Sequence, residues 1–179
     1  MQPDESNPPP IPEIPALRTT PFREFAATVL GHPAGWVASG FGAGFAPIAS
    51  GTVGTAVAVL PWLLLRELPW PAYVVAVLLA FAFGVWASDR VIRALKVQDP
   101  GVIVWDEFVG FWITMFAAPP GWQWLLAGFL LFRVFDVLKP WPVGAVDEAV
   151  HGGLGAMLDD ALAGLYALAA LQLLHLAVG

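Results

Sequence analysis

The segment Ile103–Phe116 reads IVWDEFVGFWITMF, and it places two adjacent carboxylates, Asp106 and Glu107, in a run that is otherwise apolar. A carboxylate inside a membrane segment is costly, and such residues usually belong to a functional site. We therefore treat Asp106 and Glu107 as candidate site residues on a membrane-embedded helix.

The composition of the whole chain supports a membrane location. The 179 residues are 58% hydrophobic and 12% charged, with a mean hydropathy of +0.72. Soluble domains are typically about 45–50% apolar and about 25% charged. We therefore expect an integral membrane protein with one compact domain. The net charge of −6 argues against a nucleic-acid partner, because nucleic-acid recognition needs a basic face. The absence of cysteine excludes disulfides and thiolate chemistry.

The chain divides into a tail and a membrane domain. Residues 1–21, MQPDESNPPPIPEIPALRTTP, are Pro-rich and acidic, and such composition buries too little apolar surface to fold. We expect them to form a disordered tail, with residues 22–179 as the membrane domain. Phe22–Val37 has the pattern of one short amphipathic helix at the membrane surface, and a glycine-rich run, Gly40–Thr55, follows it.

Five apolar stretches follow, each near the roughly 17–25 residues that a helix needs to cross a bilayer. They lack the alternation of barrel strands. The sequence therefore predicts an all-α polytopic membrane protein with about four to five membrane-embedded helices, of which the third is the shortest. The stretches are one that ends at Leu65, Trp70–Ala87, Val102–Ala118, Trp122–Leu138 and Leu154–Val178, with polar connectors at Ser88–Gly101 and Lys139–Gly153.

The basic residues predict the orientation. With the N-terminus in the cytoplasm and five alternating spans, seven of the eight Lys and Arg residues lie on or near the cytoplasmic side, and only Arg66 lies outside. The same threading brings four polar motifs to the cytoplasmic face, as an active site requires. These motifs are Gly40–Thr55, Asp99–Glu107, Arg133–Pro142 and His151–Asp160.

The acidic residues of these motifs are candidate metal ligands. Asp106 is four residues before Gly110, and Asp160 is four residues before Gly164. Small residues let helix backbones approach closely, which would bring the carboxylates together. Clustered carboxylates stay ionised when a cation lies among them, and Mg²⁺ prefers such oxygen ligands. The alternative is that each acid stabilises a helix N-terminus. The candidates are Asp106, Glu107, Asp136, Asp159 and Asp160.

The basic residues of the fourth stretch are candidate phosphate ligands. Arg133 could bind a phosphate through two N–H groups and Lys139 as a point charge. The alternatives are that both extend to lipid headgroups, or that Asp136 pairs with them. The glycines of Gly40–Thr55 could present backbone amides to an anion, although glycine in membrane helices more often serves packing. His151 is either a general acid or a surface residue.

Four motifs together resemble the phosphatidylglycerophosphatase A family of bacteria, in the family's order and spacing from about Trp36 to Tyr166. They are PIASGTVGT (47–55), IVWDEFVGFWIT (103–114), FRVFDVLKPWPV (132–143) and HGGLGAMLDDALAG (151–164). The chain departs from the family at Ser50, where proline is usual, and at Thr55, where serine is usual.

The resemblance implies a Mg²⁺-dependent, multi-pass enzyme of the bacterial inner membrane whose active site faces the cytoplasm. It implies hydrolysis of phosphatidylglycerophosphate to phosphatidylglycerol and phosphate in phospholipid biosynthesis. The matching positions would be catalytic at Asp106, Glu107, Asp136 and Asp160, phosphate-binding at Thr52, Arg133 and Lys139, and metal-binding at Asp106, Glu107, Asp159 and Asp160.

The mechanism and one other function stay open at this point. Water activated by a metal is the simpler nucleophile, and an aspartate that forms a phospho-enzyme is the alternative. A cation transporter or channel could also use carboxylates along a path, but the acids of this chain gather near one face. The aspartate-rich helix of phosphatidyl-alcohol transferases and the Ser-Gly-His motif of vanadium-sensitive lipid phosphatases are absent from the sequence.

Overall fold

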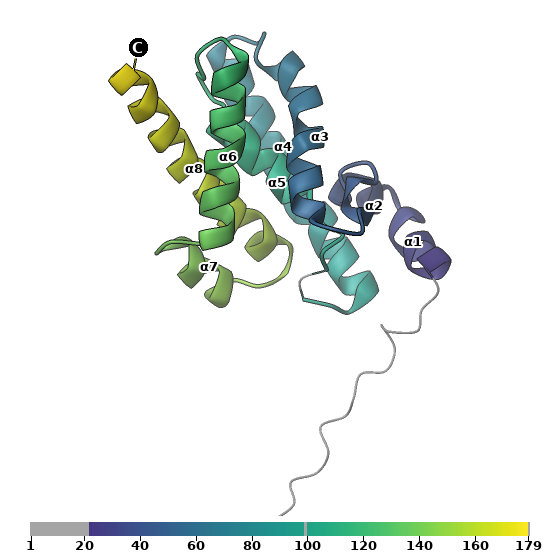
Figure 1. The fold of residues 1–179 in the computed structure, drawn as a ribbon. Coiled ribbons are helices and arrows are strands. Elements are labelled where there is room, and N and C mark those ends of the chain that lie inside the picture. Colours follow the sequence, from purple (N-terminus) through teal and green to yellow (C-terminus); the bar gives the residue numbers. More distant parts are fainter. Residues whose placement is uncertain (1–21, 99, 179) are drawn as a thin grey trace, which may run out of the picture.

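The computed structural model describes residues 22–98 and 100–178, and this part of the chain is helical, without strands. The predicted all-α class is therefore confirmed, while the predicted tail at residues 1–21 lies outside the described residues. Four long helices lie around a shorter central one, and the remaining short helices gather toward one end (Figure 1). The helices are α1 (Phe22–Leu30), α2 (Pro33–Ala38), the 3₁₀ turn η2 (Ala43–Phe45), α3 (Ser50–Leu65), α4 (Trp70–Leu95), α5 (Trp105–Thr114), α6 (Trp122–Leu138), α7 (Val143–Ala149) and α8 (Gly152–Val178).

Several helices differ from the predictions in their bounds or their number. The single amphipathic helix expected at Phe22–Val37 is two helices, because Pro33 starts α2 and the His32 side chain accepts a hydrogen bond from the Ala34 N–H as its N-cap. Helix α4 extends to Leu95, into the segment Ser88–Gly101 that was predicted as a connector, since charged residues are compatible with an exposed helix end. The connector at Lys139–Gly153 contains α7.

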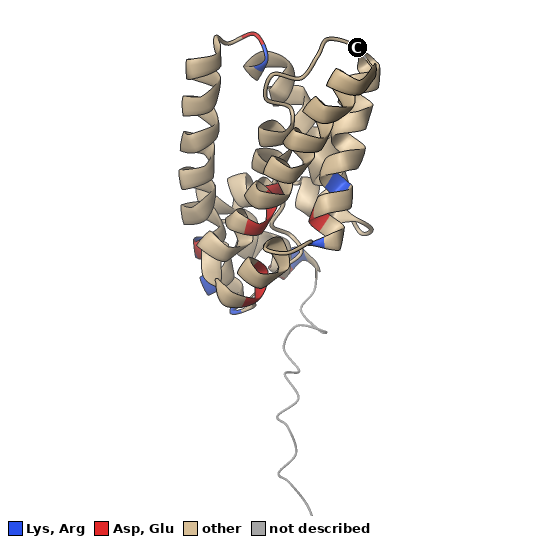
Figure 2. Cartoon of the chain, turned by 90° about the vertical axis from the view of Figure 1, so that its left-hand side faces the viewer, with Lys and Arg blue, Asp and Glu red and all other residues tan. Residues whose placement is uncertain are grey.

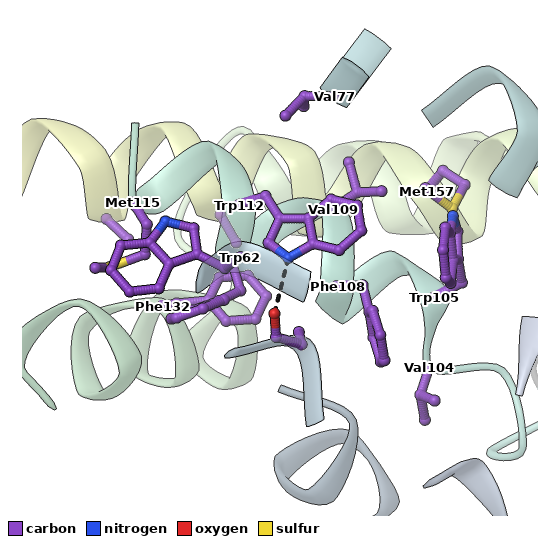
Figure 3. Packing of buried hydrophobic residues seen from close by; sticks show 14 of the residues in the cluster. Trp62, Val77, Val104, Trp105, Phe108, Val109, Trp112, Met115, Phe132 and Met157 are labelled. Carbon is purple, nitrogen blue, oxygen red and sulfur yellow. Dashed lines mark hydrogen bonds between the residues drawn. The ribbon is translucent and has the colours of Figure 1, made fainter. Parts of the chain in front are cut away.

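Helix α5 forms the centre of the molecule. Most of its ten residues are buried, and α3, α4, α6 and α8 all contact it. Indole N–H groups tie it to its neighbours: Trp112 donates to the Ala58 carbonyl of α3 at 2.9 Å, and Trp105 donates to the Ala80 carbonyl of α4 at 3.0 Å. Figure 3 shows the bond of Trp112 among the aromatic and sulfur-containing side chains that fill the core. These bonds satisfy polar groups that burial would otherwise make costly.

Helices α5 and α8 approach each other through glycine, as predicted. A Cβ built on Gly110 would lie 2.7 Å from the carbonyl oxygen of Asp160, and one built on Gly164 would collide with the Gly110 carbonyl. The Thr114 hydroxyl also donates to the Gly164 carbonyl at 3.3 Å. Only glycine leaves room for backbones this close.

Two helices, α4 with 26 residues and α8 with 27, are long and apolar enough to cross a bilayer. Helix α3 is apolar but has 16 residues, and α5 has 10. At about 1.5 Å per residue, α5 is about 15 Å long, half the hydrocarbon thickness of a bilayer. The expected third span at Val102–Ala118 is therefore a short helix enclosed by its neighbours. The number of four to five membrane-embedded helices stays a prediction.

Candidate active site

The charged residues of the described chain gather in one half of the molecule, apart from one charged turn at the opposite end (Figure 2). That turn joins α3 to α4 and contains Arg66 and Glu67, which pair at 3.5 Å. The predicted meeting of separate polar motifs at one end therefore occurs. The beginnings of α3, α5 and α8 and the end of α6 all contribute to it.

Three carboxylates form the centre of this region. Asp106 and Glu107 come from the first turn of α5 and Asp160 from α8, and one oxygen of each lies within 4.8 Å of the other two. The Gly110–Gly164 approach one turn further along both helices produces this spacing. Glu107 Oε2 and Asp160 Oδ2 are buried and have no hydrogen-bond partner. Buried charged oxygens without partners are costly unless a cation binds them.

Arg133 of α6 lies beside this group. Its Nη1 is 3.8 Å from Glu107 Oε1 and pairs with Asp136 Oδ2 one turn along the helix. The Arg133 side chain is only 19% exposed, and it forms the ion pair with Asp136 that was one of the alternatives considered for it. Its Nε is buried without a hydrogen-bond partner. The planar guanidinium thus lies between two carboxylates and still has N–H groups that can donate to a further acceptor.

The N-terminus of α3 completes this side of the site. A Cβ on Gly51 would collide with Glu107 Oε1 and lie 3.0 Å from Arg133 Nη1, so the start of α3 lies directly against these two side chains. The Ser50 hydroxyl donates to the Gly101 carbonyl at 2.8 Å, which ties the helix start to the segment before α5. Thr52 is exposed in the first turn, whereas the buried Thr55 hydroxyl donates to the Gly51 carbonyl at 2.8 Å within its own helix. Free backbone N–H groups at a helix start favour anions.

Lys139 lies directly after α6, with its Nζ 2.7 Å from Asp159 Oδ2 of α8 and 2.9 Å from Asp147 Oδ2 of α7. Burial alone would lower the pKa of Lys139, but the hydrogen bonds with Asp159 and Asp147 outweigh it and raise that pKa above its ordinary value. The ammonium is therefore charged at neutral pH. Asp159 is paired with Lys139 and lies outside the group of three carboxylates, so its predicted metal role stays a prediction.

A cavity of about 320 Å³ opens beside these groups. Sequence reasoning assigned no role to two of its polar residues, Gln98 and Asp147, which lie in the two segments predicted as polar connectors. His151 also lines the cavity, which is compatible with either role considered for it. The lining residues are Gln98, Asp106, Asp147, Val150, His151, Gly152, Gly155, Ala156 and Asp159.

The donor set of this region fits a hard divalent cation. Carboxylate oxygens are the ligands that Mg²⁺ prefers, and the two unpartnered oxygens of Glu107 and Asp160 are available to one. The local charge also favours a cation, because six carboxylates among the described residues lie in or beside the site and two basic side chains offset them. The carboxylates are those of Asp106, Glu107, Asp136, Asp147, Asp159 and Asp160, and the basic residues are Arg133 and Lys139.

Comparison with known proteins identifies relatives across most of the chain. The chain is 44% identical over 137 residues to phosphatidylglycerophosphatase A of Escherichia coli K12, and the match covers 76% of this chain and 80% of that protein. It is 42% identical over 138 residues to phosphatidylglycerophosphatase A of Haemophilus influenzae, covering 76% and 85%. A protein of Bacteroides thetaiotaomicron named "Putative phosphatidylinositol-3-phosphatase" is 40% identical over 139 residues, covering 73% and 86%.

No solved structure matches the chain. The family model for phosphatidylglycerophosphatase A matches residues 36–175, which include every candidate site residue described above. With this match and two relatives of that name at 42% and 44% identity, the chain belongs to the phosphatidylglycerophosphatase A family.

Proposed function

We propose that this protein is a Mg²⁺-dependent lipid phosphatase that hydrolyses the terminal phosphomonoester of phosphatidylglycerophosphate, giving phosphatidylglycerol and phosphate. The observation that carries the proposal is the buried group of Asp106, Glu107 and Asp160 beside the Arg133 guanidinium. A cluster of carboxylates next to basic donors is suited to a metal ion and a phosphate together. The names of two relatives supply the identity of the lipid.

The metal would be held by Asp106, Glu107 and Asp160, with Asp159 as a further ligand of the predicted set. When bound, Mg²⁺ would offset negative charge on the phosphoryl group and make water a better nucleophile at neutral pH. The protein would contribute its own charges and geometry. Arg133, Lys139 and Thr52 would bind the phosphate oxygens, and the N–H groups at the start of α3 would add to them.

Asp136 would orient the guanidinium through its ion pair with Arg133. Hydrolysis forms a bond between a water oxygen and phosphorus and breaks the bond between phosphorus and the glycerol oxygen. The proton lost by water passes to a nearby base, for which the carboxylates of this group are suited, and the glycerol oxygen gains a proton. Donors fixed by the protein would hold the phosphoryl group so that the water oxygen and the glycerol oxygen lie in line with phosphorus.

A membrane location fits both the substrate and the chain. The lipid stays in the bilayer, so the enzyme must bind it at headgroup depth. Helices α4 and α8 supply two candidate spans, and the charged half of the molecule would lie at the cytoplasmic surface of the bacterial inner membrane. The protein would cross this membrane several times, with the site facing the cytoplasm.

Phosphate release from phosphatidylglycerophosphate in mixed micelles tests the proposal. We expect turnover by the purified protein that stops in EDTA and returns with Mg²⁺. Asp160→Asn should lower kcat by about a hundredfold or more, because it removes a charge from the metal group. Glu67→Gln, the matched control at the opposite end, should retain wild-type turnover.

The same assay contains the results that would refute the proposal. Full activity in EDTA, or a wild-type rate in Asp160→Asn, would remove the metal group from the mechanism. Phosphatidylinositol 3-phosphate is the comparison substrate, because one relative is named for that lipid. A higher kcat/KM on it would reassign the headgroup while leaving lipid phosphomonoester hydrolysis in place.

A further inference from the structure

Helix α7 reaches Lys139 with one carboxylate, that of Asp147. Lys139 Nζ lies 2.9 Å from Asp147 Oδ2 and 2.7 Å from Asp159 Oδ2, so one carboxylate comes from α7 and the other from α8. The Lys139 side chain is 32% exposed, that of Asp159 is 10% exposed and that of Asp147 is 46% exposed. The Lys139 ammonium thus bridges two carboxylates, the buried one of Asp159 and the half-exposed one of Asp147.

The backbone of α7 also packs closely against Lys139. A Cβ on Gly144 would lie 3.0 Å from the Lys139 carbonyl oxygen and 3.8 Å from Lys139 Cβ. Gly144 and Asp147 are three residues apart and therefore share a helix face. That face is held in place because Val143 is fully buried and the Tyr166 hydroxyl donates to the Trp141 carbonyl at 3.1 Å.

A lysine side chain has to be restrained before it can serve a defined anion site. Its four-carbon stem has up to about 2 kcal/mol of rotamer entropy to lose. Its ammonium has three N–H donors, so two carboxylates fix it and leave one donor for a further anion. Both carboxylates line the cavity of about 320 Å³, together with Asp106 of the metal group.

We propose that Asp147 is a positioning residue that, together with Asp159, holds the Lys139 ammonium against the two carboxylates that line this cavity, within reach of the phosphoryl oxygens of the substrate. Helix α7 thereby completes the anion site that α3 and α6 begin. The inference rests on the proposed function, since it takes the anion to be a phosphate, and it assigns a role to a residue outside the predicted catalytic, metal and phosphate-binding sets.

The direction in which removal of Asp147 changes phosphate affinity distinguishes positioning of Lys139 from a simple effect of the Asp147 charge. Asp147 is an anion at the edge of a cavity that has to receive an anion. If it acted only through its charge, removing it would make the cavity less negative and phosphate would bind more tightly. If it positions Lys139, removing it frees the ammonium and phosphate binds more weakly. The two explanations predict changes in opposite directions.

Binding of inorganic phosphate to the detergent-solubilised protein with Mg²⁺ present, measured by calorimetry, is the test. We expect Asp147→Ala to weaken phosphate binding about fivefold, the upper end for loss of a partly exposed ion pair. Glu148→Ala is the matched control, since it removes an exposed carboxylate from the neighbouring position of α7. It should leave binding unchanged or slightly tighter. Asp147→Glu should restore most of the affinity, because it returns the carboxylate.

A double-mutant cycle with Lys139→Ala distinguishes positioning from damage to the fold. In that background Asp147→Ala should weaken phosphate binding no further, because the lysine it positions is gone. Equal weakening in both backgrounds would overturn the proposal, as would wild-type or tighter binding in Asp147→Ala. Absence of phosphate binding by the wild-type protein would overturn it as well.

The binding measurement also keeps this inference separate from the proposed reaction. A protein that binds phosphate with the expected coupling but releases none from phosphatidylglycerophosphate would refute the reaction and leave the role of Asp147 intact. A protein that hydrolyses the lipid while Asp147→Ala binds phosphate like wild type would refute the role of Asp147 alone.

Discussion

Arg133 is held between two acids of different origin, Asp136 on its own helix and Glu107 on α5. A guanidinium has five N–H donors in a fixed plane, so it can pair with both carboxylates and still donate to a third group. An ammonium would supply the same charge without that plane. The shape of the side chain, and not only its charge, is therefore expected to matter at this position.

Arg133→Lys tests this expectation. It keeps the positive charge but loses the planar fork, and we expect kcat/KM on phosphatidylglycerophosphate to fall at least about tenfold, which is about 1.4 kcal/mol of transition-state binding. Steady-state phosphate release measures it. Arg66→Lys, at the opposite end of the molecule, is the control and should be close to wild type. A change below about twofold in Arg133→Lys would reject the role in binding phosphate.

At the scale of elements, the contact between α5 and α8 sets the spacing of the carboxylates in the proposed metal group. Gly110 and Gly164 face each other one turn beyond Asp106 and Asp160 on their helices. Because side chains four residues apart lie on the same helix face, a close glycine contact carries the neighbouring acids together. The packing and the proposed metal group are consequences of the same four-residue spacing.

Gly164→Ala should separate the two helices and lower stability. Alanine is the better helix former by up to about 1 kcal/mol, but its Cβ would collide with the Gly110 carbonyl, and overpacking costs about 1–3 kcal/mol. The obstacle is backbone and cannot rotate away, so the clash outweighs the gain. We expect a lower Tm in a detergent thermal-unfolding assay.

Gly101→Ala is the control for this effect, because a Cβ there meets nothing within 4 Å. Its Tm should stay close to that of wild type. A Tm for Gly164→Ala equal to or above the wild-type value would mean that the helices separate at no cost. Such a result would remove the packing argument for the position of Asp160.

For the molecule as a whole, the division of charge between its two ends decides how it would sit in a membrane. The site, α7 and most basic residues lie in one half, and the Arg66–Glu67 turn lies at the other end. Basic residues near cytoplasmic ends of membrane helices favour that side. Ala145 on α7 and Glu67 are both exposed and so can report on the two ends.

Single cysteines at these two positions test the orientation, since the chain has no cysteine of its own. An impermeant maleimide should label Glu67→Cys in intact cells and Ala145→Cys only in inverted vesicles. The Cys-free protein is the control for background labelling. Labelling of both positions from the same side would contradict the proposed threading and the cytoplasmic location of the site.

The sequence alone determined the helical class, the family motifs and the approach of α5 to α8. Each depends on features that are local along the chain: the length of apolar runs, the residues within a motif, and the four-residue spacing of Asp106 from Gly110 and of Asp160 from Gly164. Helix periodicity converts such spacing directly into a shared face. For this reason a packing contact between distant helices could be anticipated.

Only the tertiary structure decided which charged groups meet. The sequence offered Asp159 and Asp160 as equivalent neighbours, yet successive residues on a helix point about 100° apart, so Asp160 lies toward α5 whereas Asp159 pairs with Lys139. Helix α7 could not be predicted from the sequence either, because its seven residues between Pro142 and Val150 are too few to show a helical periodicity. The bond between Lys139 and Asp147 exists because packing against α8 folds that segment back onto the end of α6, and no local pattern records that contact.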